Sequence, residues 1–381
     1  METSDFDFEN LFSIFEQSII SNIKENSYDE FLIAYSGGVD STALLYFSKK
    51  IALKLNKKII AIHINHNLSK DSKNWETHCR NFCKKIGVEL ICENLSIVLD
   101  KGDSIEEKAR NARYEAIYKY MNKRTAMLTA HHIEDQAETF FYQLLRGAGA
   151  KGLASMPIFK VLNHGVHIRP FLKFNKKALV DIVSFNKLDH INDTSNNDIK
   201  FSRNFIRKNI IPIVKKKWPN CNETISRSAF NLSESNKLNE DLAKIDFEKY
   251  FYETDNRISV NTRNLENYRF NNVIRFWIKK NNFRMPTFDQ LKSIRNNIFS
   301  AGEDKTPFFA CSDYEIRRYN DYVEIMSPLS KHDASKVYTW KFKENLIISD
   351  LAINFSWRNL EDRLGFKVNR DVVVKFRRTG E

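Results

Sequence analysis

The first 200 residues alternate between two patterns of apolar residues, and this alternation limits the fold more than any other feature. Short apolar runs are typical of buried strands, whereas apolar residues that recur every three or four positions are typical of helices. The predicted strands are 31–35, 59–65, 88–95 and 125–132, with 167–171 as a candidate fifth, and the predicted helices are 41–55, 74–87, 104–123 and 133–147. Alternating strands and helices predict an α/β fold with a doubly wound, mostly parallel sheet.

The pattern changes near residue 220. Helical spacing returns in 226–252, 268–282 and 287–300, the segment 308–326 resembles a hairpin that turns at Asn-Asp-Tyr, and alternating runs follow after 336. We therefore expect three domains: an α/β domain at 1–217, a mainly helical second domain at 218–330, and a small β-rich C-terminal module at 331–381. Because the chain ends abruptly on a strand pattern, we expect this last module to be partial, that is, truncated.

Composition and charge restrict the partners and the compartment. The formal net charge is +12, which favours a polyanion such as nucleic acid, although a basic surface that only confers solubility gives the same number. The five cysteines form no CxxC pair. Cys79 and Cys83 lie one helical turn apart, and we interpret them as two reduced thiols on a helix. No segment reaches the roughly eighteen apolar residues of a membrane span. These features predict a cytoplasmic protein without a membrane partner.

A glycine-containing loop joins the first predicted strand to the first predicted helix. Free N–H groups at a helix N-terminus attract an anion, and two glycines allow close approach of the backbone. The loop is neither GxxxxGK[ST] nor GxGxxG, and its acid would repel phosphates unless a cation lies between them, so Asp40 implies Mg²⁺. A plain glycine turn is the alternative. The candidate phosphate-binding residues are Ser36, Gly37, Gly38, Val39, Asp40 and Ser41.

The string SGGVDS resembles the pyrophosphate-binding loop of the N-type ATP pyrophosphatases, or PP-loop superfamily. These enzymes split ATP into AMP and pyrophosphate and adenylate an acceptor. The resemblance implies an adenine-nucleotide-hydrolase-like fold. The superfamily includes GMP synthetases, NAD synthetases, tRNA thiolases and tRNA(Ile)-lysidine synthetases, and the loop alone does not choose among them.

Four further stretches resemble motifs of the tRNA(Ile)-lysidine synthetases. They are HINHNL at 63–68, the Ala-Arg-x-x-Arg-Tyr core at 109–114, TAHHIEDQAETFFYQLLRGAGAKGLASM at 129–156 and the Asp-Thr-Ser-Asn to Ile-Arg segment at 193–207. Glu134 replaces the usual aspartate of this family, and we expect the change to be tolerated because Asp135 is kept. Related thiolating enzymes carry paired CxxC motifs, which this sequence lacks. The family also continues beyond the point where this chain ends.

The resemblance implies a specific reaction. Lysidine synthetases use ATP and Mg²⁺ to join L-lysine to C2 of the wobble cytidine in the CAU anticodon of tRNA(Ile), through an adenylated cytidine, with release of AMP and pyrophosphate. The product reads AUA instead of AUG. The resemblance also implies that the second and third domains bind tRNA, and a homodimer is a further expectation. The alternatives are another PP-loop pyrophosphatase that acts on tRNA, such as a thiolase, and a non-catalytic tRNA-binding module.

The resemblance assigns roles to residues outside the loop. We expect Asp40 to bind Mg²⁺, and Asp135 either to bind the metal or to take the proton of the amine. His63 is expected to contact adenosine, with a structural histidine as an equal alternative. Arg113 is a candidate phosphate or transition-state clamp, with a solvated helix face as its alternative. Only one of His131 and His132 can face the site, because neighbouring residues of a strand point in opposite directions, and the resemblance favours His132.

The remaining candidates concern lysine and tRNA. Glu138 lies three residues after Asp135, on the same helix face, and is expected to bind the lysine ammonium. Arg146 belongs to a glycine-rich loop expected to close over the base. Arg203 and Arg207 are candidates for tRNA phosphate, ATP phosphate or the lysine carboxylate, and 208–220 reads as a basic linker. An unstacked cytosine also needs an aromatic platform, which the sequence does not identify.

Overall fold

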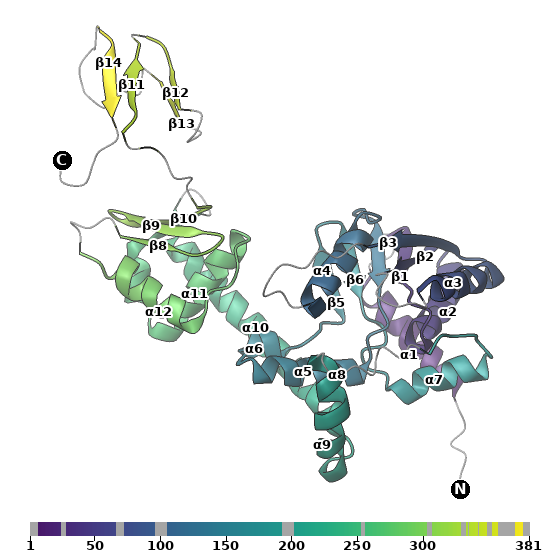
Figure 1. The fold of residues 1–381 in the computed structure, drawn as a ribbon. Helices are drawn as coiled ribbons and strands as arrows, with labels where there is room; N and C mark the ends of the chain where they lie inside the picture. Colours follow the sequence, from purple (N-terminus) through teal and green to yellow (C-terminus); the bar gives the residue numbers. More distant parts are fainter. Residues whose placement is uncertain are drawn as a thin grey trace. The chain divides into compact units, whose positions relative to one another are not determined.

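A six-stranded sheet forms the centre of the first unit in this computed structural model, which describes residues 7–23, 28–65, 72–95, 105–192, 202–252, 256–302, 307–328, 333, 335–341, 343–348, 353–356 and 370–375. Contacts divide the chain into two compact units, Met1–Lys237 and Leu238–Glu381. The sheet has the strand order β3-β2-β1-β4-β6-β5 (Figure 1). Its strands are β1 (Glu30–Ala34), β2 (Lys58–Asn65), β3 (Glu89–Asn94), β4 (Thr125–Leu128), β5 (Phe159–Leu162) and β6 (Gly165–Ile168).

All neighbouring strands are parallel except β5, which runs antiparallel to β6. Strands β1 and β4 are buried along their length because helices cover both faces of the sheet, as in most parallel sheets. The chain passes from β1 outward to β3 and then returns to β4 on the other side of β1. The carboxyl ends of β1 and β4 therefore flank the topological switch point, where such sheets bind ligands.

The helices of the first unit cover the two faces unequally. Residues of α1, α2, α3 and α7 pack with Phe31 and Ile33 on one face, whereas α4 packs with Leu32 and Met127 on the other. Figure 1 shows these helices around the sheet. The helices are α1 (Phe8–Ile20), α2 (Val39–Lys54), α3 (Ser72–Ile86), α4 (Ile105–Tyr118), α5 (Ile133–Leu145), α6 (Ala150–Leu153), α7 (Lys176–Phe185), α8 (Ser202–Phe205) and α9 (Ile211–Lys217), with the π-helical turn η2 (Ile206–Ile210) before α9.

The predicted parallel α/β fold is confirmed, and four local predictions need correction. The fourth strand ends at Leu128, so 129–132 is a loop. The fifth strand is Gly165–Ile168, because Pro170 lacks an N–H group for the ladder. Strand β5 and helices α1 and α7 were not predicted, and the basic segment 208–220 is largely helical instead of a linker. The capping box expected at Ser104 and Glu107 lies outside the described residues.

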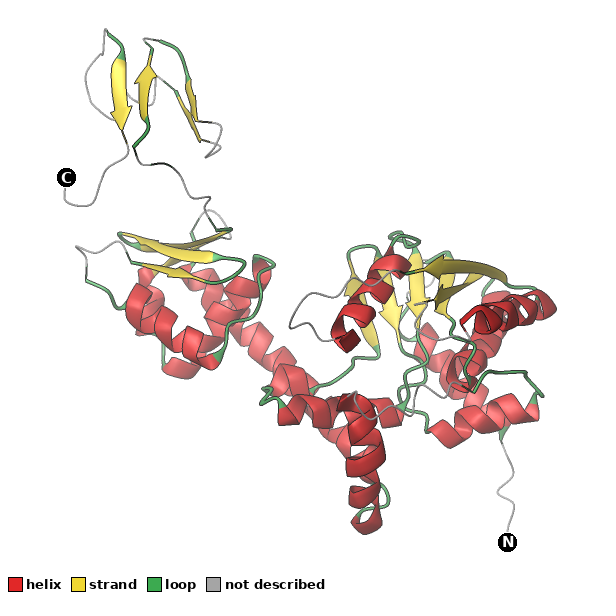
Figure 2. Cartoon of the chain, in the orientation of Figure 1, coloured by secondary structure: helices red, strands yellow, loops and turns green. Residues whose placement is uncertain are grey.

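The second unit combines helices with an antiparallel sheet of order β7-β10-β9-β8. Helix α10 (Cys221–Tyr250) leads into it, followed by α11 (Asn267–Lys280), α12 (Phe288–Ile294), the 3₁₀ turn η3 (Val260–Asn264) and the π turn η4 (Arg295–Phe299). The strands are β7 (Arg257–Ser259), β8 (Phe308–Ala310), β9 (Glu315–Tyr319) and β10 (Tyr322–Met326). The predicted hairpin is confirmed, with its turn at Asn320 and Asp321. Figure 2 shows the helices against one face of this sheet, where Trp277 and Ile316 share one core.

Two antiparallel pairs follow in the last part of the chain. Strand β11 (Val337–Trp340) pairs with β14 (Val372–Lys375), and β12 (Leu346–Ile348) pairs with β13 (Ile353–Phe355). This arrangement confirms the expected β-rich character of the C-terminal module. Within the described part of the chain, no helix is both long and apolar enough to cross a membrane.

Candidate active site

The loop after β1 is held in shape by its own hydroxyl groups. The Oγ atoms of Ser36 and Ser41 lie 3.1 Å apart, the Ser36 N–H donates to Ser41 Oγ at 3.2 Å, and Ser41 Oγ donates to the Gly38 carbonyl at 3.0 Å. Gly38 is the N-cap of α2 and has no side chain to satisfy the first N–H groups of the helix. Those backbone donors and the helix dipole are the anion-binding elements of the loop.

Glycine is required at position 37. Its φ angle is +84°, and a Cβ atom there would lie 2.6 Å from Ile191 Cδ1 and 3.0 Å from Cys79 Sγ. The Gly37 carbonyl accepts a hydrogen bond from the Ile191 N–H at 2.8 Å. The loop is therefore packed against Ile191, which lies far away in the sequence, and any larger residue at position 37 would push the loop and Ile191 apart.

Asp40 lies in the first turn of α2 and faces the loop that follows β4. Its Oδ2 is 3.7 Å from His132 Nε2 and 3.7 Å from Lys176 Nζ. Its Oδ1 is buried and has no hydrogen-bond partner. A buried carboxylate oxygen without a donor is costly, so this atom suits a cation.

His132 is the N-cap of α5 and is surrounded by acids. Its Nδ1 donates to Glu134 Oε2 at 2.9 Å, and its Nε2 lies 3.5 Å from Asp135 Oδ2. Burial lowers the pKa of His132, but the bond to Glu134 and the charges of Asp135 and Asp40 outweigh it and raise the pKa above its ordinary value. The imidazole therefore favours its charged form between two carboxylates.

Asp135 and Glu138 project from the same face of α5, as predicted. Asp135 Oδ2 accepts from the His132 backbone N–H at 3.0 Å. Burial opposes ionisation of Asp135, but the positive charges of nearby His132 and Arg203 lower its pKa below the ordinary value. The site thus keeps an ionised carboxylate beside Asp40.

Glu138 is buried and paired with an arginine. Arg207 Nε donates to Oε1 at 2.5 Å and Arg207 Nη2 donates to Oε2 at 2.9 Å. Arg203 lies further away, with Nε 3.9 Å from Glu138 Oε2, and donates to Thr139 Oγ1 at 2.9 Å. Burial raises the pKa of Glu138, and Arg207 opposes that effect. Both arginines predicted for phosphate or lysine therefore point toward α5 in this structure.

His63 lies at the end of β2 and is almost fully buried. Its Nδ1 donates to the Tyr35 carbonyl at 3.0 Å, and burial lowers its pKa, so the ring is neutral with Nε2 as an acceptor. The backbone bond supports the structural alternative, and contact with adenosine stays a prediction.

Two predicted residues lie outside this cluster of contacts. Arg146 follows the C-terminal end of α5, where its Nη1 donates to the Tyr142 hydroxyl at 2.5 Å and its guanidinium stacks over that ring. Arg113 has an exposed side chain on α4. Residues 193–201 of the last motif fall outside the described residues.

A second chain of hydrogen bonds approaches the site from β6. Arg169 Nη2 lies 3.1 Å from His167 Nδ1, His167 Nε2 lies 2.8 Å from Thr129 Oγ1, and Thr129 Oγ1 lies 2.8 Å from His131 Nδ1. Burial lowers the pKa of His167 to about 2 and of His131 to about 3. Because arginine can only donate, His167 Nδ1 accepts from Arg169 and His167 Nε2 donates to Thr129 Oγ1. The Thr129 hydroxyl then donates to His131 Nδ1, so His131 keeps its proton on Nε2. The two histidines thus serve different networks, although neither lies in a strand as we expected.

The sequence did not identify Glu134, Lys176 or this histidine chain as parts of the site. Glu134 carried a signal, since it is the departure within the motif. Its longer carboxylate accepts from both His132 and the Lys176 backbone N–H, the latter at 3.1 Å. Lys176 begins an unpredicted helix, and no motif marks it.

Comparison with known proteins identifies the family. Residues 11–214 match a family model described as the PP-loop domain, and residues 261–323 match the TilS substrate binding domain. The tRNA(Ile)-lysidine synthase of Coxiella burnetii is 34% identical over 367 residues, which cover 95% of this chain and 80% of that protein. The chain belongs to the tRNA(Ile)-lysidine synthase family. Another lysidine synthase, from Buchnera aphidicola subsp. Schizaphis graminum, is 38% identical over 311 residues, 80% of this chain and 69% of that protein.

A solved structure supports the fold of this lysidine synthase family member. The U34-tRNA thiolase NcsA from Methanococcus maripaludis aligns with a TM-score of 0.50 and 16% identity, covering 60% of this chain and 81% of NcsA. This likeness concerns the fold alone. The PP-loop domain implies that the chain uses ATP, and the geometry places that loop beside the acids of α5.

Proposed function

We propose that this chain joins L-lysine to C2 of the wobble cytidine in the CAU anticodon of tRNA(Ile), using ATP. The observation that carries the proposal is the convergence of two motifs: Asp40 of the phosphate loop lies against His132, which begins the helix that holds Asp135 and Glu138. A nucleotide bound at the loop would thus have its phosphates next to acids suited to an amine. Membership of the lysidine synthase family supports the same reaction.

The loop is proposed to bind the departing pyrophosphate. Its serine hydroxyls and the Gly38 N–H are engaged within the loop, so the backbone N–H groups of the first helical turn, from Val39 to Ser41, are the natural phosphate donors. His63 and Arg113 are also proposed to contact the nucleotide. Unpaired backbone donors at a helix start give the loop affinity for phosphate without a lysine of the P-loop type.

Asp40 and Asp135 are proposed to hold Mg²⁺ together with the phosphates. The residues fit the ion, because Asp40 Oδ1 is buried without a donor and Asp135 is ionised. No group of three or more His, Cys, Asp or Glu side chains capable of holding a metal occurs among the described residues. Mg²⁺ is commonly bound by one or two carboxylates together with substrate phosphates. When bound, the ion would neutralise charge on the leaving pyrophosphate.

The reaction needs two displacements. In the first, O2 of cytosine attacks the α-phosphorus and pyrophosphate leaves, which converts a poor leaving group into AMP. In the second, the lysine ammonium first gives up one proton to solvent, and the resulting neutral ε-amine adds to C2. A further proton is lost from the nitrogen to a base, and the C2–O bond breaks with release of AMP. Asp135 is proposed to accept that proton. Closure of the Arg146 loop is proposed to exclude water from the adenylated base.

Glu138 is proposed to bind the lysine ammonium before it is deprotonated. In this structure Arg207 occupies both carboxylate oxygens, so the ammonium must share or replace that pair. Arg207, once displaced from Glu138, would then be free to bind the lysine carboxylate or a phosphate. This exchange of partners would couple lysine binding to the position of Arg207, with Arg203 anchored on Thr139.

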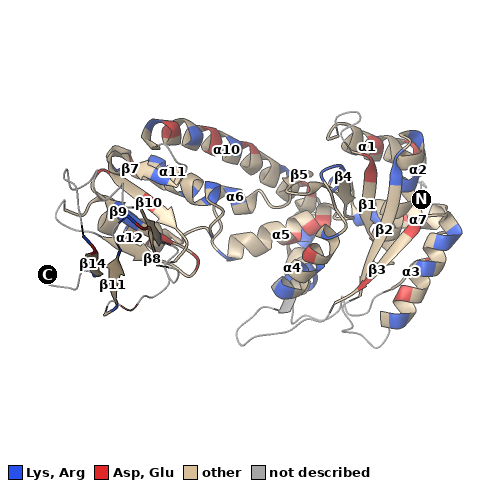
Figure 3. Ribbon diagram, turned by 90° about the horizontal axis from the view of Figure 1, so that it is seen from above, with Lys and Arg blue, Asp and Glu red and all other residues tan. Residues whose placement is uncertain are grey.

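The part of the chain after residue 217 is proposed to bind tRNA. The match of residues 261–323 to the TilS substrate binding domain supports this role for the proposed second domain, 218–330. Lys and Arg occur on elements of both units, and on α10 they are interleaved with acids (Figure 3). We also place the reaction in the cytoplasm, where tRNA is modified, and assign residues 331–381 to a further tRNA-binding module.

Nucleoside mass spectrometry tests the proposal. The full chain is incubated with ATP, Mg²⁺, isotopically labelled lysine and tRNA(Ile) transcript, and the RNA is digested to nucleosides. We expect a cytidine derivative that carries the mass of the labelled lysine. Parallel incubation with a sulfur donor tests thiolation, and a sulfur-containing nucleoside without a lysine adduct would overturn the proposal in favour of that alternative.

A further inference from the structure

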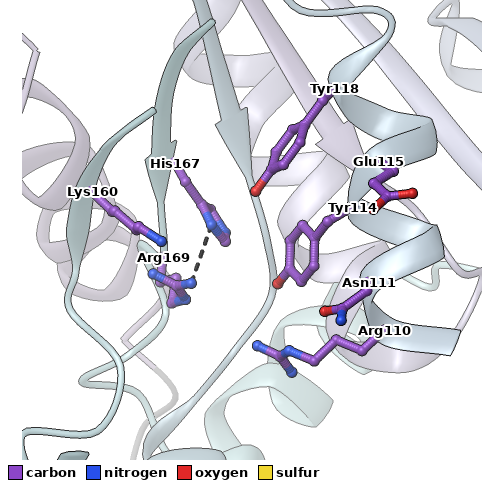
Figure 4. Close-up of a pocket in the computed structure, with 8 residues that line it drawn as sticks. All are labelled: Arg110, Asn111, Tyr114, Glu115, Tyr118, Lys160, His167 and Arg169. Atoms are coloured by element: carbon purple, nitrogen blue, oxygen red, sulfur yellow. Dashed lines mark hydrogen bonds between the residues drawn. The ribbon is translucent and has the colours of Figure 1, made fainter. Parts of the chain in front are cut away.

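A cavity of about 330 Å³ opens between α4 and the β5–β6 hairpin, and its lining includes no residue of the Ser36–Ser41 loop. Tyr114 and Tyr118 from α4 face Lys160, His167 and Arg169 from the hairpin region across it (Figure 4). Its size lies in the range of small-molecule sites. The cavity shares His167 with the chain of hydrogen bonds that ends at His131.

The cavity contains a buried cation without a carboxylate. Arg169 is 5% exposed, and its Nη1 donates to the Pro157 carbonyl at 2.8 Å, but it forms no ion pair with any described residue. Its Nε is buried without a partner. Arg110 and Lys160 add two more positive charges, and among the described lining residues Glu115 is the single acid. Buried charges are normally compensated, so this excess of positive charge points to an anionic ligand.

The same cavity offers aromatic faces. The rings of Tyr114 and Tyr118 lie 6.0 Å apart, and the Tyr114 ring lies 5.8 Å from that of His167. The Arg110 guanidinium lies over Tyr114, 5.3 Å from its centroid. Aromatic rings next to arginines bind nucleobases by stacking while the cations hold phosphate. The ligand class indicated is therefore a nucleotide.

A second cavity of about 630 Å³ continues from the first. Both cavities are lined by Glu115, Tyr118 and Lys160, and the second adds Lys119 and His164. The second cavity adds basic side chains next to the first, which favours a polymer whose backbone continues beyond the bound base.

We propose that the first cavity binds one unpaired nucleotide of an RNA substrate, with its base against Tyr114 and its phosphate near Arg110 and Arg169, while the second cavity receives the flanking backbone. The identification of this RNA as tRNA rests on the proposed function. Through His167 and Thr129, an occupied cavity would also orient His131 beside the acids.

The test measures binding of a fluorescent anticodon stem-loop RNA to the full-length chain, with ATP affinity measured in parallel. Arg110→Ala and Tyr114→Leu should each weaken RNA binding about tenfold. Tyr114→Phe, which keeps the ring, should bind RNA as the wild type does. Arg124→Ala removes an exposed arginine outside the cavity and is the matched control. ATP affinity should not change in any of these variants.

Unchanged RNA affinity in Arg110→Ala and Tyr114→Leu would overturn the inference. Loss of ATP affinity with RNA affinity retained would also overturn it, because the cavity would then be a mononucleotide site. Should Tyr114→Leu lose its near-ultraviolet circular dichroism, Arg110→Ala decides alone, since that side chain is partly exposed. Lysidine formation by the wild type separates the two proposals. If lysidine forms but RNA binding does not depend on the cavity residues, only the cavity proposal is rejected. If RNA binding depends on the cavity residues but no lysidine forms, only the proposed reaction is rejected.

Discussion

His132 Nε2 lies 3.7 Å from Asp40 Oδ2, and this contact joins the phosphate loop after β1 to the helix that follows β4. The same nitrogen is 3.5 Å from Asp135 Oδ2, so one imidazole bridges two carboxylates from different motifs. Because β1 and β4 are adjacent parallel strands, both loops emerge at the same edge of the sheet. The ATP-binding and amine-binding parts of the proposed reaction are thereby brought together.

Replacing Asp40 by Asn should stop the first displacement. The amide keeps the size of the side chain but loses the charge that balances the cation, so pyrophosphate release should fall by about a hundredfold or more. Binding of tRNA should be unchanged. A coupled pyrophosphate assay measures the rate, with Asp189→Asn, an exposed acid, as control. Unaltered release would remove Asp40 from the mechanism.

Replacing Glu138 by Gln should act on lysine and spare adenylation. The variant cannot neutralise the lysine ammonium, so KM for lysine should rise about ten- to a hundredfold, the range for hydrogen bonds to charged groups. Pyrophosphate release with tRNA and ATP alone should stay within a few-fold of the wild type. Glu223→Gln on α10 is the control. An equal loss of both activities would contradict a lysine-specific role.

Because His167 is held neutral in the folded state, the first unit should become less stable to unfolding as pH falls. Burial lowers its folded-state pKa to about 2, well below the unfolded value of 6.5, so the unfolded chain binds the extra proton between these values. The stability it contributes is present above pH 6.5 and declines as pH falls, by about 1.4 kcal/mol per pH unit. The charged or titratable groups that act on its ring are Arg169, His131, Lys160 and Arg110.

Urea unfolding at several pH values between 7 and 5 checks this effect. The wild type should lose stability more steeply than His167→Gln, which cannot take up the proton, and His164→Gln on the exposed β5–β6 turn is the control. Parallel pH profiles for the wild type and His167→Gln would show that the ring is not held neutral.

Binding of tRNA should weaken with salt. The net charge of +12 implies contacts with phosphates, and each contact releases counterions. Affinity should therefore fall at least about tenfold between about 50 and about 200 mM KCl. Filter binding measures it, and a neutral osmolyte at equal osmolality should have no effect. A flat salt response would contradict the argument from charge.

Much of the fold could be predicted because parallel strands are buried on both faces and leave continuous apolar runs. FLIA in β1 and TAML in β4 are such runs. Strand β5 escaped prediction because it is short, lies at the sheet edge and does not alternate between buried and exposed side chains: Lys160 and Val161 at its centre are both exposed. Its position depends on Gly165, whose φ is +114° and whose missing Cβ would lie 2.2 Å from the Thr125 carbonyl oxygen. Such a tertiary contact leaves no periodic signal in the sequence.

The candidate site was predicted where residues belong to a motif and missed where they meet only in space. The spacing of Asp135 and Glu138 placed them on one helix face, as the structure shows. No spacing could predict that Arg169 contacts His167 and that Thr129 links this pair to His131, since the contacts join β6 to the loop after β4. The pairing of Arg207 with Glu138 likewise depends on how α5 packs against the η2 turn.

A crystal structure with a non-hydrolysable ATP analogue, Mg²⁺ and lysine tests the central claim most directly. The account predicts the β- and γ-phosphates on the backbone N–H groups of the Ser36–Ser41 loop, with the lysine ammonium at Glu138. Phosphates bound elsewhere while that loop stays empty, or lysine held away from α5, would contradict it.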